Sequence, residues 1–498
     1  MPPHYDLCVI GCGPGGFAGT MRAVDLGKRV CVIEADQIGG AGVRWGALAS
    51  KTLWELAKDY DIARKVDRGF RAAELSVDYT AVRASVIAAV EEKQQQLLGQ
   101  LETFSPRNRE PGQGQVTFLR GRARFLNPDH VAVHLARGGQ TVVGADFFLI
   151  ATGSRPRPLG DIETDQRQVL DSDGVLNLTD FPRRLAIIGA GIIGCEFASI
   201  FSNFGQTRVS LIDHAEQIIP YEDEDISAFV NANLTANGVR IHHSAVLREI
   251  RRTPGDLEVV LDLKSGGSRV LSANAVLVAV GRAPQLDGLG LAEAGITPDE
   301  RGFLQVDADG RVAGRIFACG DVTAHPALVN LAEMESRHAV AAMFGAPRRP
   351  LFYRNMSTVM FFKPSLAAVG LNEKTCRKKG IAYRVASFSN ALLTRAIAMR
   401  ATNGFVKILV TDDPAQKILG MRAAGPQASS TIMSVAMLID QDKGLTDSLK
   451  TLHPHPTMSE AIQECLRLLS GDSIYKPEAF PELLRIRAWD PERGDHPA

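Results

Sequence analysis

The chain has 498 residues, of which 45% are hydrophobic and 22% charged, so its composition is that of a folded globular protein and excludes an intrinsically disordered one. A chain of this length predicts about three domains. Lys plus Arg equals Asp plus Glu at 56 each, so nothing in the net charge indicates a nucleic-acid or acidic-membrane partner. The seven cysteines include no CxxC pair, which argues against a secreted disulfide scaffold.

Targeting and membrane segments are not indicated either. The first residues, Met-Pro-Pro-His-Tyr-Asp, lack the basic region of a signal peptide. The longest apolar run, from Leu185 to Cys195, is too short to span a bilayer and ends at Glu196. We therefore expect a cytoplasmic protein with no membrane span.

A dinucleotide-binding pattern begins the chain. Leu7 to Ile10 is a short apolar run that predicts a buried parallel strand, and Gly11-x-Gly13-x-x-Gly16 follows it and opens a helix from Ala18 to Leu26. A second strand, Arg29 to Ile33, ends at Glu34. In this pattern the glycines let the backbone approach a pyrophosphate, the helix N-terminus donates N–H groups, and the acidic side chain accepts a ribose hydroxyl.

The same pattern occurs a second time. A strand from Leu185 to Ile188 leads into Gly189-x-Gly191-x-x-Gly194 and a helix through Phe201, and a strand from Val209 to Ile212 ends at Asp213. Two copies in one chain predict two bound dinucleotides. A carboxylate at Asp213 accepts from a 2′-hydroxyl and repels a 2′-phosphate, which favours NAD(H) over NADP(H), although His214 next to it weakens that discrimination.

Between the two patterns we expect two helices and a small antiparallel insert. Ser50 to Tyr60 predicts a helix with Lys51 in its first turn, and apolar residues at helical spacing from Val82 to Leu101 predict a long amphipathic helix packed on the sheet. Val116 to Asn127 and Val131 to Leu135 are expected to be strands of the insert.

Four further motifs carry a family resemblance: Gly39-Gly40-x-x-x-x-x-x-x-x-x-Ser50-Lys51, Ala151-Thr152-Gly153, Gly320-Asp321 and His455-Pro456-Thr457 with Glu460. In this order, and with the two glycine-rich patterns, the chain resembles the pyridine nucleotide–disulfide oxidoreductases, which include dihydrolipoamide dehydrogenase, over residues 5 to 470. The resemblance implies an α/β fold with two Rossmann-like domains, for FAD and NAD, and an α+β dimerisation domain. We expect the FAD domain at 1–156 and 282–350, the NAD domain at 157–281, the interface domain at 351–470 and a C-terminal extension at 471–498.

The resemblance also implies site residues in a homodimer with a shared active site. Lys51 and Glu196 pair beside the flavin, and His455 with Glu460 forms an acid–base dyad that reaches the other subunit's flavin site. The FAD-binding residues are Gly11, Gly13, Gly15, Gly16, Glu34, Gly39, Gly40, Lys51, Ala123, Thr152, Gly153, Gly320 and Asp321, and the NAD-binding residues are Gly189, Gly191, Gly194, Asp213 and Gly281. No metal site is expected.

One departure decides the functional prediction. Where the family carries its two redox cysteines, this chain has Gly42 and Ala47. Reduction of a disulfide substrate proceeds through thiolate attack and a mixed disulfide, which these residues cannot support. We therefore expect an FAD-dependent NAD(P)H oxidoreductase in which NADH reduces FAD and the electrons pass directly to a small acceptor such as a quinone.

Three alternatives stay open. A soluble pyridine nucleotide transhydrogenase is similar over the same span and shares the Trp45-Gly46 pair. A dihydrolipoamide dehydrogenase-like subunit acting on a thiol or protein-borne substrate would use sulfurs that the substrate supplies. A non-catalytic flavin-binding subunit, sensory or structural, is the third. The C-terminal extension either wraps the dimer or covers the mouth of a site.

Overall fold

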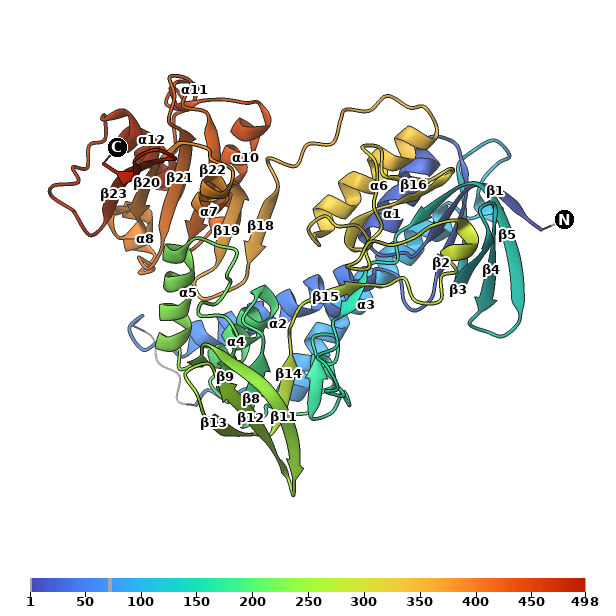
Figure 1. Cartoon of the computed structure of the whole chain (residues 1–498), viewed down its shortest axis with the longest axis horizontal. Helices are drawn as coiled ribbons and strands as arrows, with labels where there is room; N and C mark the ends of the chain where they lie inside the picture. Colours follow the sequence, from blue (N-terminus) through green and yellow to red (C-terminus); the bar gives the residue numbers. More distant parts are fainter. Residues whose placement is uncertain (1, 70–73, 498) are drawn as a thin grey trace. The chain divides into compact units, whose positions relative to one another are not determined.

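The computed structural model describes residues 2–69 and 74–497, and these fall into two compact units (Figure 1). The first unit consists of Met1–Pro182 and Asn274–Leu351, and the second of Arg183–Ala273 and Phe352–Ala498. Each unit contains one glycine-rich loop between a parallel strand and a helix. The predicted α/β class with two dinucleotide-binding folds is therefore confirmed.

A seven-stranded sheet forms the centre of the first unit. Its strands are β1 (His4–Ile10), β2 (Arg29–Glu34), β3 (Gln115–Asn127), β4 (His130–Leu135), β5 (Gln140–Ile150), β16 (Arg311–Ala313) and β17 (Ile316–Ala318). Their order is β1-β2-β3-β4-β5-β17-β16, and β1 also pairs with β5. β1 runs parallel to both β2 and β5, and β5 runs parallel to β17.

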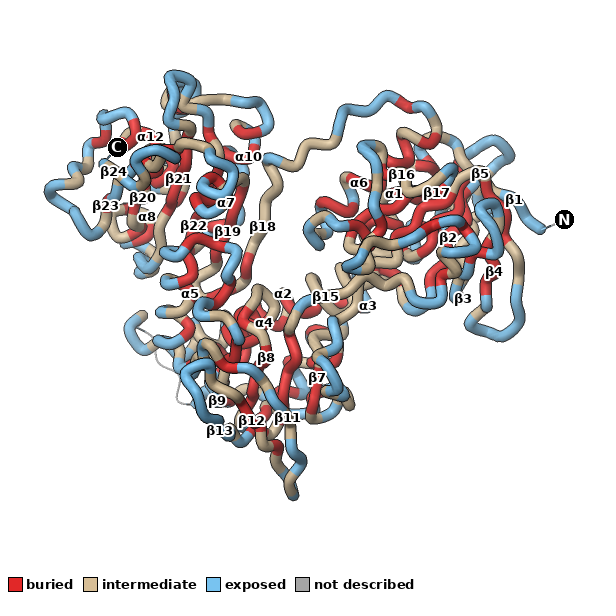
Figure 2. Tube along the Cα trace, viewed as in Figure 1, coloured by how far each residue is buried: buried red, intermediate tan, exposed pale blue. Residues whose placement is uncertain are grey.

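Alternate residues of these strands are buried on opposite faces of the sheet. Cys8 and Ile10 belong to one hydrophobic cluster, whereas Leu7 and Val9 belong to another. Apolar runs without polar alternation are what a sheet covered on both faces requires. Figure 2 shows β1, β2 and β17 buried along most of their length.

Helices α1 (Pro14–Asp25) and α6 (Val329–Met343) pack against each other and bury residues in the cluster that contains Leu7. The π-helix η1 (Ala41–Trp45) leads into α2 (Ala47–Ala63), which packs against α3 (Tyr79–Thr103). Smaller elements are η2 (Pro106–Asn108), η3 (Val175–Asn177), η4 (Ala292–Ala294), η5 (Gly320–Val322), the antiparallel pair β6 (Ser154–Pro156) and β15 (Arg282–Pro284), and the parallel pair β7 (Val169–Asp171) and β14 (Ala275–Val278).

Two sequence predictions for this unit are wrong. β3 is not confined to an antiparallel insert, because its first half, from Gln115 to Arg120, pairs in parallel with β2 before its second half turns antiparallel to β4. Its apolar residues therefore extend the main sheet. In addition, α2 begins at Ala47 rather than Ser50, which places Lys51 in the second helical turn instead of the first.

The second unit contains three parallel strands in the order β10-β9-β8, namely β8 (Arg184–Ile188), β9 (Arg208–Ile212) and β10 (Arg240–His242). Helix α4 (Ile192–Phe204) follows the second glycine-rich loop, and α5 (Glu224–Ala236) precedes β10. The antiparallel strands β11 (Ala245–Thr253), β12 (Asp256–Leu263) and β13 (Ser268–Ala273) form a separate sheet.

The C-terminal part of this unit is built on a seven-stranded antiparallel sheet of order β18-β19-β22-β21-β20-β23-β24. Its strands are β18 (Ser357–Met360), β19 (Leu366–Gly370), β20 (Tyr383–Ser389), β21 (Phe405–Thr411), β22 (Ile418–Ala424), β23 (Leu484–Asp490) and β24 (Gly494–His496). The accompanying helices are α7 (Glu373–Lys378), η6 (Asn390–Leu392), α8 (Thr394–Ala398), α9 (Ala428–Thr431), α10 (Met433–Asp440), α11 (Leu445–Ser448) and α12 (Glu460–Ser470).

The C-terminal extension supplies the last two strands of that sheet. β23 pairs with β20 from Tyr383 to Phe388, and the Trp489 ring stacks on Tyr383 with ring centroids 5.8 Å apart. Arg377 donates to the Asp495 carboxylate at 2.6 Å. Residues 484–496 are therefore an integral part of the sheet and cover what would otherwise be an open strand edge.

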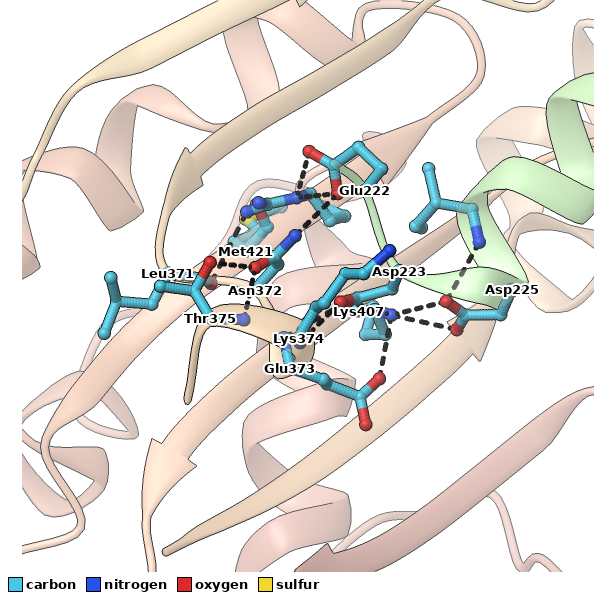
Figure 3. A network of polar contacts seen from close by, with 12 residues as sticks. Glu222, Asp223, Asp225, Leu371, Asn372, Glu373, Lys374, Thr375, Lys407 and Met421 are labelled. Carbon is cyan, nitrogen blue, oxygen red and sulfur yellow. Dashed lines mark hydrogen bonds and ion pairs between the residues drawn. The ribbon is translucent and has the colours of Figure 1, made fainter. Parts of the chain in front are cut away.

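A buried ion-pair network joins residues 222–225 to the C-terminal sheet (Figure 3). The Nζ of Lys407 on β21 is 2.8 Å from Asp223, 2.7 Å from Asp225 and 2.9 Å from Glu373, and the Lys407 side chain is 1% exposed. The carboxylates of Asp223, Asp225 and Glu373 lie close enough together to bind a metal ion, but the ammonium group of Lys407 lies among them and pairs with all three. Burial would raise the pKa of Asp223, yet Lys407 and main-chain donors outweigh it and lower that pKa.

Within the described residues, no helix combines the length and the apolar character needed to cross a membrane.

Candidate active site

The first glycine-rich loop joins β1 to α1. A Cβ on Gly11, where φ is +99°, would lie 2.4 Å from the carbonyl oxygen of Ala151, and a Cβ on Gly16 would lie 1.9 Å from the carbonyl oxygen of Gly11. A Cβ on Gly15 would crowd the Cys319 sulfur at 3.1 Å. These positions therefore require glycine. A Cβ on Gly13, by contrast, would meet no atom within 4 Å, so this glycine faces open space at the N-terminus of α1.

Glu34 at the end of β2 holds this loop. Its carboxylate accepts from the main-chain N–H of Cys12 at 2.7 Å and of Asp36 at 2.8 Å, and the residue is only 9% exposed. Burial raises the pKa of Glu34 in spite of these two donors. A carboxylate has about four acceptor positions, so these two donors leave room for the predicted ribose hydroxyl.

The second loop repeats the arrangement between β8 and α4. Gly189 has φ of +104°, and a Cβ on Gly194 would lie 1.8 Å from the carbonyl oxygen of Gly189, whereas Gly191 faces open space. Asp213 accepts from the N–H groups of Ala190 at 2.5 Å and Ala215 at 2.8 Å. The two loops thus have the same backbone arrangement, and each unit contains one of them.

Both loops fit the phosphates of a dinucleotide. The middle glycines, Gly13 and Gly191, each have open space beside them at a helix N-terminus. Main-chain N–H groups and the helix dipole favour an anion at such a position. Neither helix has an acidic residue in its first turn that would repel a phosphate. Gly281, with φ of +105°, also has open space where a Cβ would be.

The turn after β5 lies against the first loop, because a Cβ on Gly11 would approach the Thr152 Cα at 3.1 Å. The Thr152 hydroxyl is buried and has no hydrogen-bond partner among the described residues. Gly153 has φ of +69° and open space beside it. A buried polar atom without a partner is a position where a polar group of a ligand fits.

Asp321 lies in η5, and a series of hydrogen bonds between side chains holds its carboxylate in place. Arg282 donates to the Ser154 hydroxyl at 2.8 Å, and that hydroxyl donates to the Asp321 carboxylate at 2.5 Å. The N–H of Gly320 donates to the Glu335 carboxylate on α6 at 2.8 Å. The Gly320–Asp321 turn is therefore fixed from both sides.

The π-helix η1 packs directly on the first loop. Gly39 and Gly40 have φ of +93° and +47°, and the N–H of Gly39 donates to the carbonyl of Cys12 at 2.8 Å. A Cβ on Gly42 would lie 2.4 Å from Cγ of Pro14. Immediately after this segment, α2 begins at Ala47 and carries Lys51, whose Nζ donates to the Ser50 hydroxyl at 3.2 Å.

An arginine–aromatic pair lies at the end of η1. The Arg44 guanidinium lies 3.9 Å from the centroid of the Trp45 ring and pairs with Asp36 at 2.5 Å. This cation–π pair follows the segment that packs on the first glycine-rich loop.

Glu196 is in α4 of the second unit and is 5% exposed. Its carboxylate accepts from the main-chain N–H of Phe361 at 2.9 Å. Lys51 belongs to the first unit, so the Lys51–Glu196 pair remains a prediction.

The structure does bring His455 and Glu460 together. The His455 Nδ1 is 2.8 Å from the Glu460 carboxylate, which also accepts from the N–H of Thr457 at 2.8 Å. The His455 side chain is 64% exposed, and the Glu460 side chain is 22% exposed. The carboxylate therefore orients an accessible imidazole, which is the geometry of a general acid–base pair.

All seven cysteines are free and buried. Cys195 lies in α4 and Cys319 precedes η5, and burial raises the pKa of both thiols. Cys8 and Cys31 are opposite each other in β1 and β2. None of the seven lies in η1 or α2.

Sequence reasoning missed three features of the site. These are the π-helical form of residues 41–45, the contact between Gly42 and Pro14, and the anchoring of Asp321 through Ser154 and Arg282. The close glycine spacing from Gly39 to Gly46 was the available signal for an irregular helix. Ala123 lies in β3 opposite Val133, and its contact with FAD remains a prediction.

Comparison with known proteins decides the family. Residues 5–337 match the model described as pyridine nucleotide-disulphide oxidoreductase, and residues 356–466 match the dimerisation domain of the same family. The chain belongs to the pyridine nucleotide-disulphide oxidoreductases. It is therefore an oxidoreductase of a family that uses FAD and NAD(H), and its dimerisation domain supports a homodimer.

Relatives in this family match almost end to end. The dihydrolipoyl dehydrogenases of Bacillus subtilis and Geobacillus stearothermophilus are 31% and 32% identical, over 95% and 94% of this chain and 98% and 97% of theirs. Among solved structures, LpdA from Mycobacterium tuberculosis superposes with a TM-score of 0.84 at 25% identity, covering 94% of this chain and 99% of that one. The HOCl-induced flavoprotein disulfide reductase RclA from Escherichia coli gives 0.81 at 26% identity, covering 93% and 100%.

Proposed function

We propose that this family member is an NADH-dependent FAD oxidoreductase that passes electrons directly to a small acceptor, with a quinone as the first candidate. The feature that supports the proposal is the pair Gly42 and Ala47, which the family resemblance aligns with the redox cysteines of the disulfide reductases. Neither side chain can attack sulfur, so no mixed disulfide forms there.

The chain's own cysteines do not supply a substitute. Burial raises the pKa of Cys12, Cys195 and Cys319, which keeps these thiols protonated and unreactive at neutral pH. Cys376 is likewise buried, with a pKa of about 12. A quinone needs no covalent help, because it accepts two electrons and two protons and is released as the hydroquinone.

The predicted site residues then have distinct roles. The first loop, with Glu34 and Asp321, holds FAD, and the second loop with Asp213 holds the nicotinamide coenzyme. Bound FAD supplies hydride acceptance from NADH and electron delivery to the acceptor. Lys51 places a cation beside the flavin, ordered by Glu196, and a cation there favours the reduced, anionic form of the ring.

His455 donates the proton that the reduced acceptor takes up. Its orientation by Glu460 at 2.8 Å and its 64% exposure suit exchange with solvent. Within the proposed homodimer this dyad completes the site of the other subunit. The predicted division of the chain, with FAD at 1–156 and 282–350, NAD at 157–281, the interface at 351–470 and an extension at 471–498, is part of the same proposal.

The test is a steady-state assay of the FAD-loaded protein with NADH and, separately, benzoquinone, lipoamide and glutathione disulfide. We expect turnover with the quinone only, and a Lys51→Met variant that reduces its flavin more slowly than wild type. The control is Lys417→Met, which removes an exposed lysine paired with Asp442 in the second unit. This variant should reduce its flavin and turn over the quinone at the wild-type rates. Lipoamide turnover at a rate comparable to quinone turnover would contradict the proposal.

A further inference from the structure

Two histidines flank Gly144 at the end of β1 that is farthest from the first glycine-rich loop. Gly144 on β5 is in register with His4 on β1 in a parallel pair and with His130 on β4 in an antiparallel pair. Residues in register on neighbouring strands project from the same face of a sheet. His4 and His130 therefore lie on one face, on either side of a residue that has no side chain.

The rings of both histidines lean over Gly144. A Cβ on Gly144 would lie 3.1 Å from the His4 Nδ1 and 3.2 Å from the His130 Nε2, and these two nitrogens are the atoms nearest to that point beyond the adjoining residues. One ring nitrogen of each histidine thus borders the small space that the glycine leaves unfilled.

The other nitrogen of each ring is hydrogen-bonded to an oxygen. The His4 Nε2 is 2.9 Å from the Asp146 carboxylate, which accepts, so Nε2 carries the proton. The His130 Nδ1 is 3.2 Å from Oδ1 of Asn127, and the same oxygen accepts from the main-chain N–H of Asp129 at 2.9 Å, so this Nδ1 also carries a proton. In the neutral rings, the two nitrogens beside the glycine consequently have lone pairs.

This arrangement is typical of metal-binding histidines. A metal-bound imidazole donates its second N–H to a carboxylate or another oxygen, which fixes the tautomer and the orientation of the ring. The Asp146 carboxylate also adds a negative charge that favours a cation. The side chains of His4 and Asp146 are 54% and 49% exposed, so water can fill the remaining coordination positions.

We propose that His4 and His130 form a surface site for a divalent transition-metal ion of the class that imidazole binds, such as Zn²⁺, Ni²⁺ or Cu²⁺. Asp146 and Asn127 act as positioning residues for the two rings. The bound ion links β1 to β4 across β5. The sequence gave no sign of this site, because its two ligands are far apart in the chain and come together only through the register of three strands.

The test is a titration of the oxidised, FAD-loaded protein with Cu²⁺, which binds nitrogen ligands most tightly in its series. Calorimetry gives the affinity, and electron paramagnetic resonance counts the coordinating nitrogens. Wild type is expected to bind one ion with hyperfine splitting from two imidazole nitrogens. His4→Ala and His130→Ala should each remove this signal. His134→Ala should keep it and is the matched control, because His134 is an exposed histidine on the same strand, β4.

Two further variants keep both histidines and test the geometry. Gly144→Ala fills the space between the rings and should abolish the two-nitrogen signal, and Asp146→Asn should weaken binding by about tenfold. The flavin absorbance spectrum shows that each variant is folded. A wild type that binds no ion or shows a single nitrogen would overturn the inference. A two-nitrogen signal that persists in His4→Ala or in Gly144→Ala would overturn it as well, because the ion would then be bound adventitiously elsewhere.

Discussion

Replacing Gly42 with cysteine is expected to destabilise the first unit unless Pro14 is replaced as well. A Cβ at position 42 would lie 2.4 Å from Cγ and 3.1 Å from Cδ of Pro14, and real contacts of this kind are longer than 3.0 Å. Pro14 is the first residue of α1, and its ring is rigid, so it cannot rotate away. Overpacking of this kind costs about 1–3 kcal/mol in free energy of unfolding.

Thermal unfolding of the FAD-loaded protein measures this cost. With about 2–4 °C per kcal/mol for a folding unit of this size, Gly42→Cys should lower the unfolding temperature by several degrees. Ala47→Cys is the matched control, because it adds one sulfur at the partly buried first residue of α2. Pro14→Ala combined with Gly42→Cys should recover most of the loss. A Gly42→Cys protein as stable as wild type, or no recovery with Pro14→Ala, would refute the steric reasoning.

This contact also changes how a gain of function should be sought. Introducing two cysteines by Gly42→Cys and Ala47→Cys alone would test a strained π-helix rather than disulfide chemistry. The variant that also carries Pro14→Ala relieves the contact. Lipoamide turnover in that triple variant, and not in Pro14→Ala alone, would indicate that the remaining disulfide-reductase machinery is intact.

Two other substitutions and one truncation test separate parts of the structure. Gly194→Ala puts a Cβ 1.8 Å from the carbonyl oxygen of Gly189, so flavin reduction by NADH should be lost while the FAD content, measured by absorbance, stays at the wild-type level. Lys407→Met leaves buried carboxylates without their cation and should cost about 3–5 kcal/mol in chemical unfolding, unlike the exposed Lys417→Met. The lowered pKa of Asp223 means that its contribution is present above its ordinary value of 3.8 and is lost as the pH falls through its folded pKa, so the difference between wild type and Lys407→Met should shrink in acid. Ending the chain after residue 470 removes β23 and β24, which should expose the edge of β20 and cause aggregation measurable by light scattering.

The sequence predicted the dinucleotide folds well because their determinants are local. The strand, glycines, helix and terminal acid of each pattern are consecutive, and the structure has each element where the pattern predicts it. The contacts of these residues with a dinucleotide remain predictions. The beginning of α2 was misjudged because the π-helix before it ends in Gly46, whose N–H donates to the carbonyl of Ala41, and nothing in residue propensities indicates that bond.

Long-range pairing accounts for the other differences. β3 reads as a strand of an insert, yet its first half joins β2, which lies about eighty residues earlier in the chain. The extension after residue 470 has turn residues and prolines that give no hint of strand β23, because its stability comes from pairing with β20 and from stacking of Trp489 on Tyr383.

The dyad of His455 and Glu460 separates quinone reduction from the transhydrogenase alternative. Transhydrogenation moves a hydride from one nicotinamide to another and leaves no proton to deliver, so a positioned His455 would have no task. Reduction of a quinone to the hydroquinone by NADH takes up one proton in addition to the hydride, and general acid catalysis by a positioned side chain is worth about 100-fold or more. The imidazole that Glu460 orients at 2.8 Å therefore favours the quinone. His455→Gln should lower quinone turnover and leave hydride transfer from NADH to an NADP⁺ analogue unchanged, whereas an equal loss of both activities would point to a structural role for the dyad.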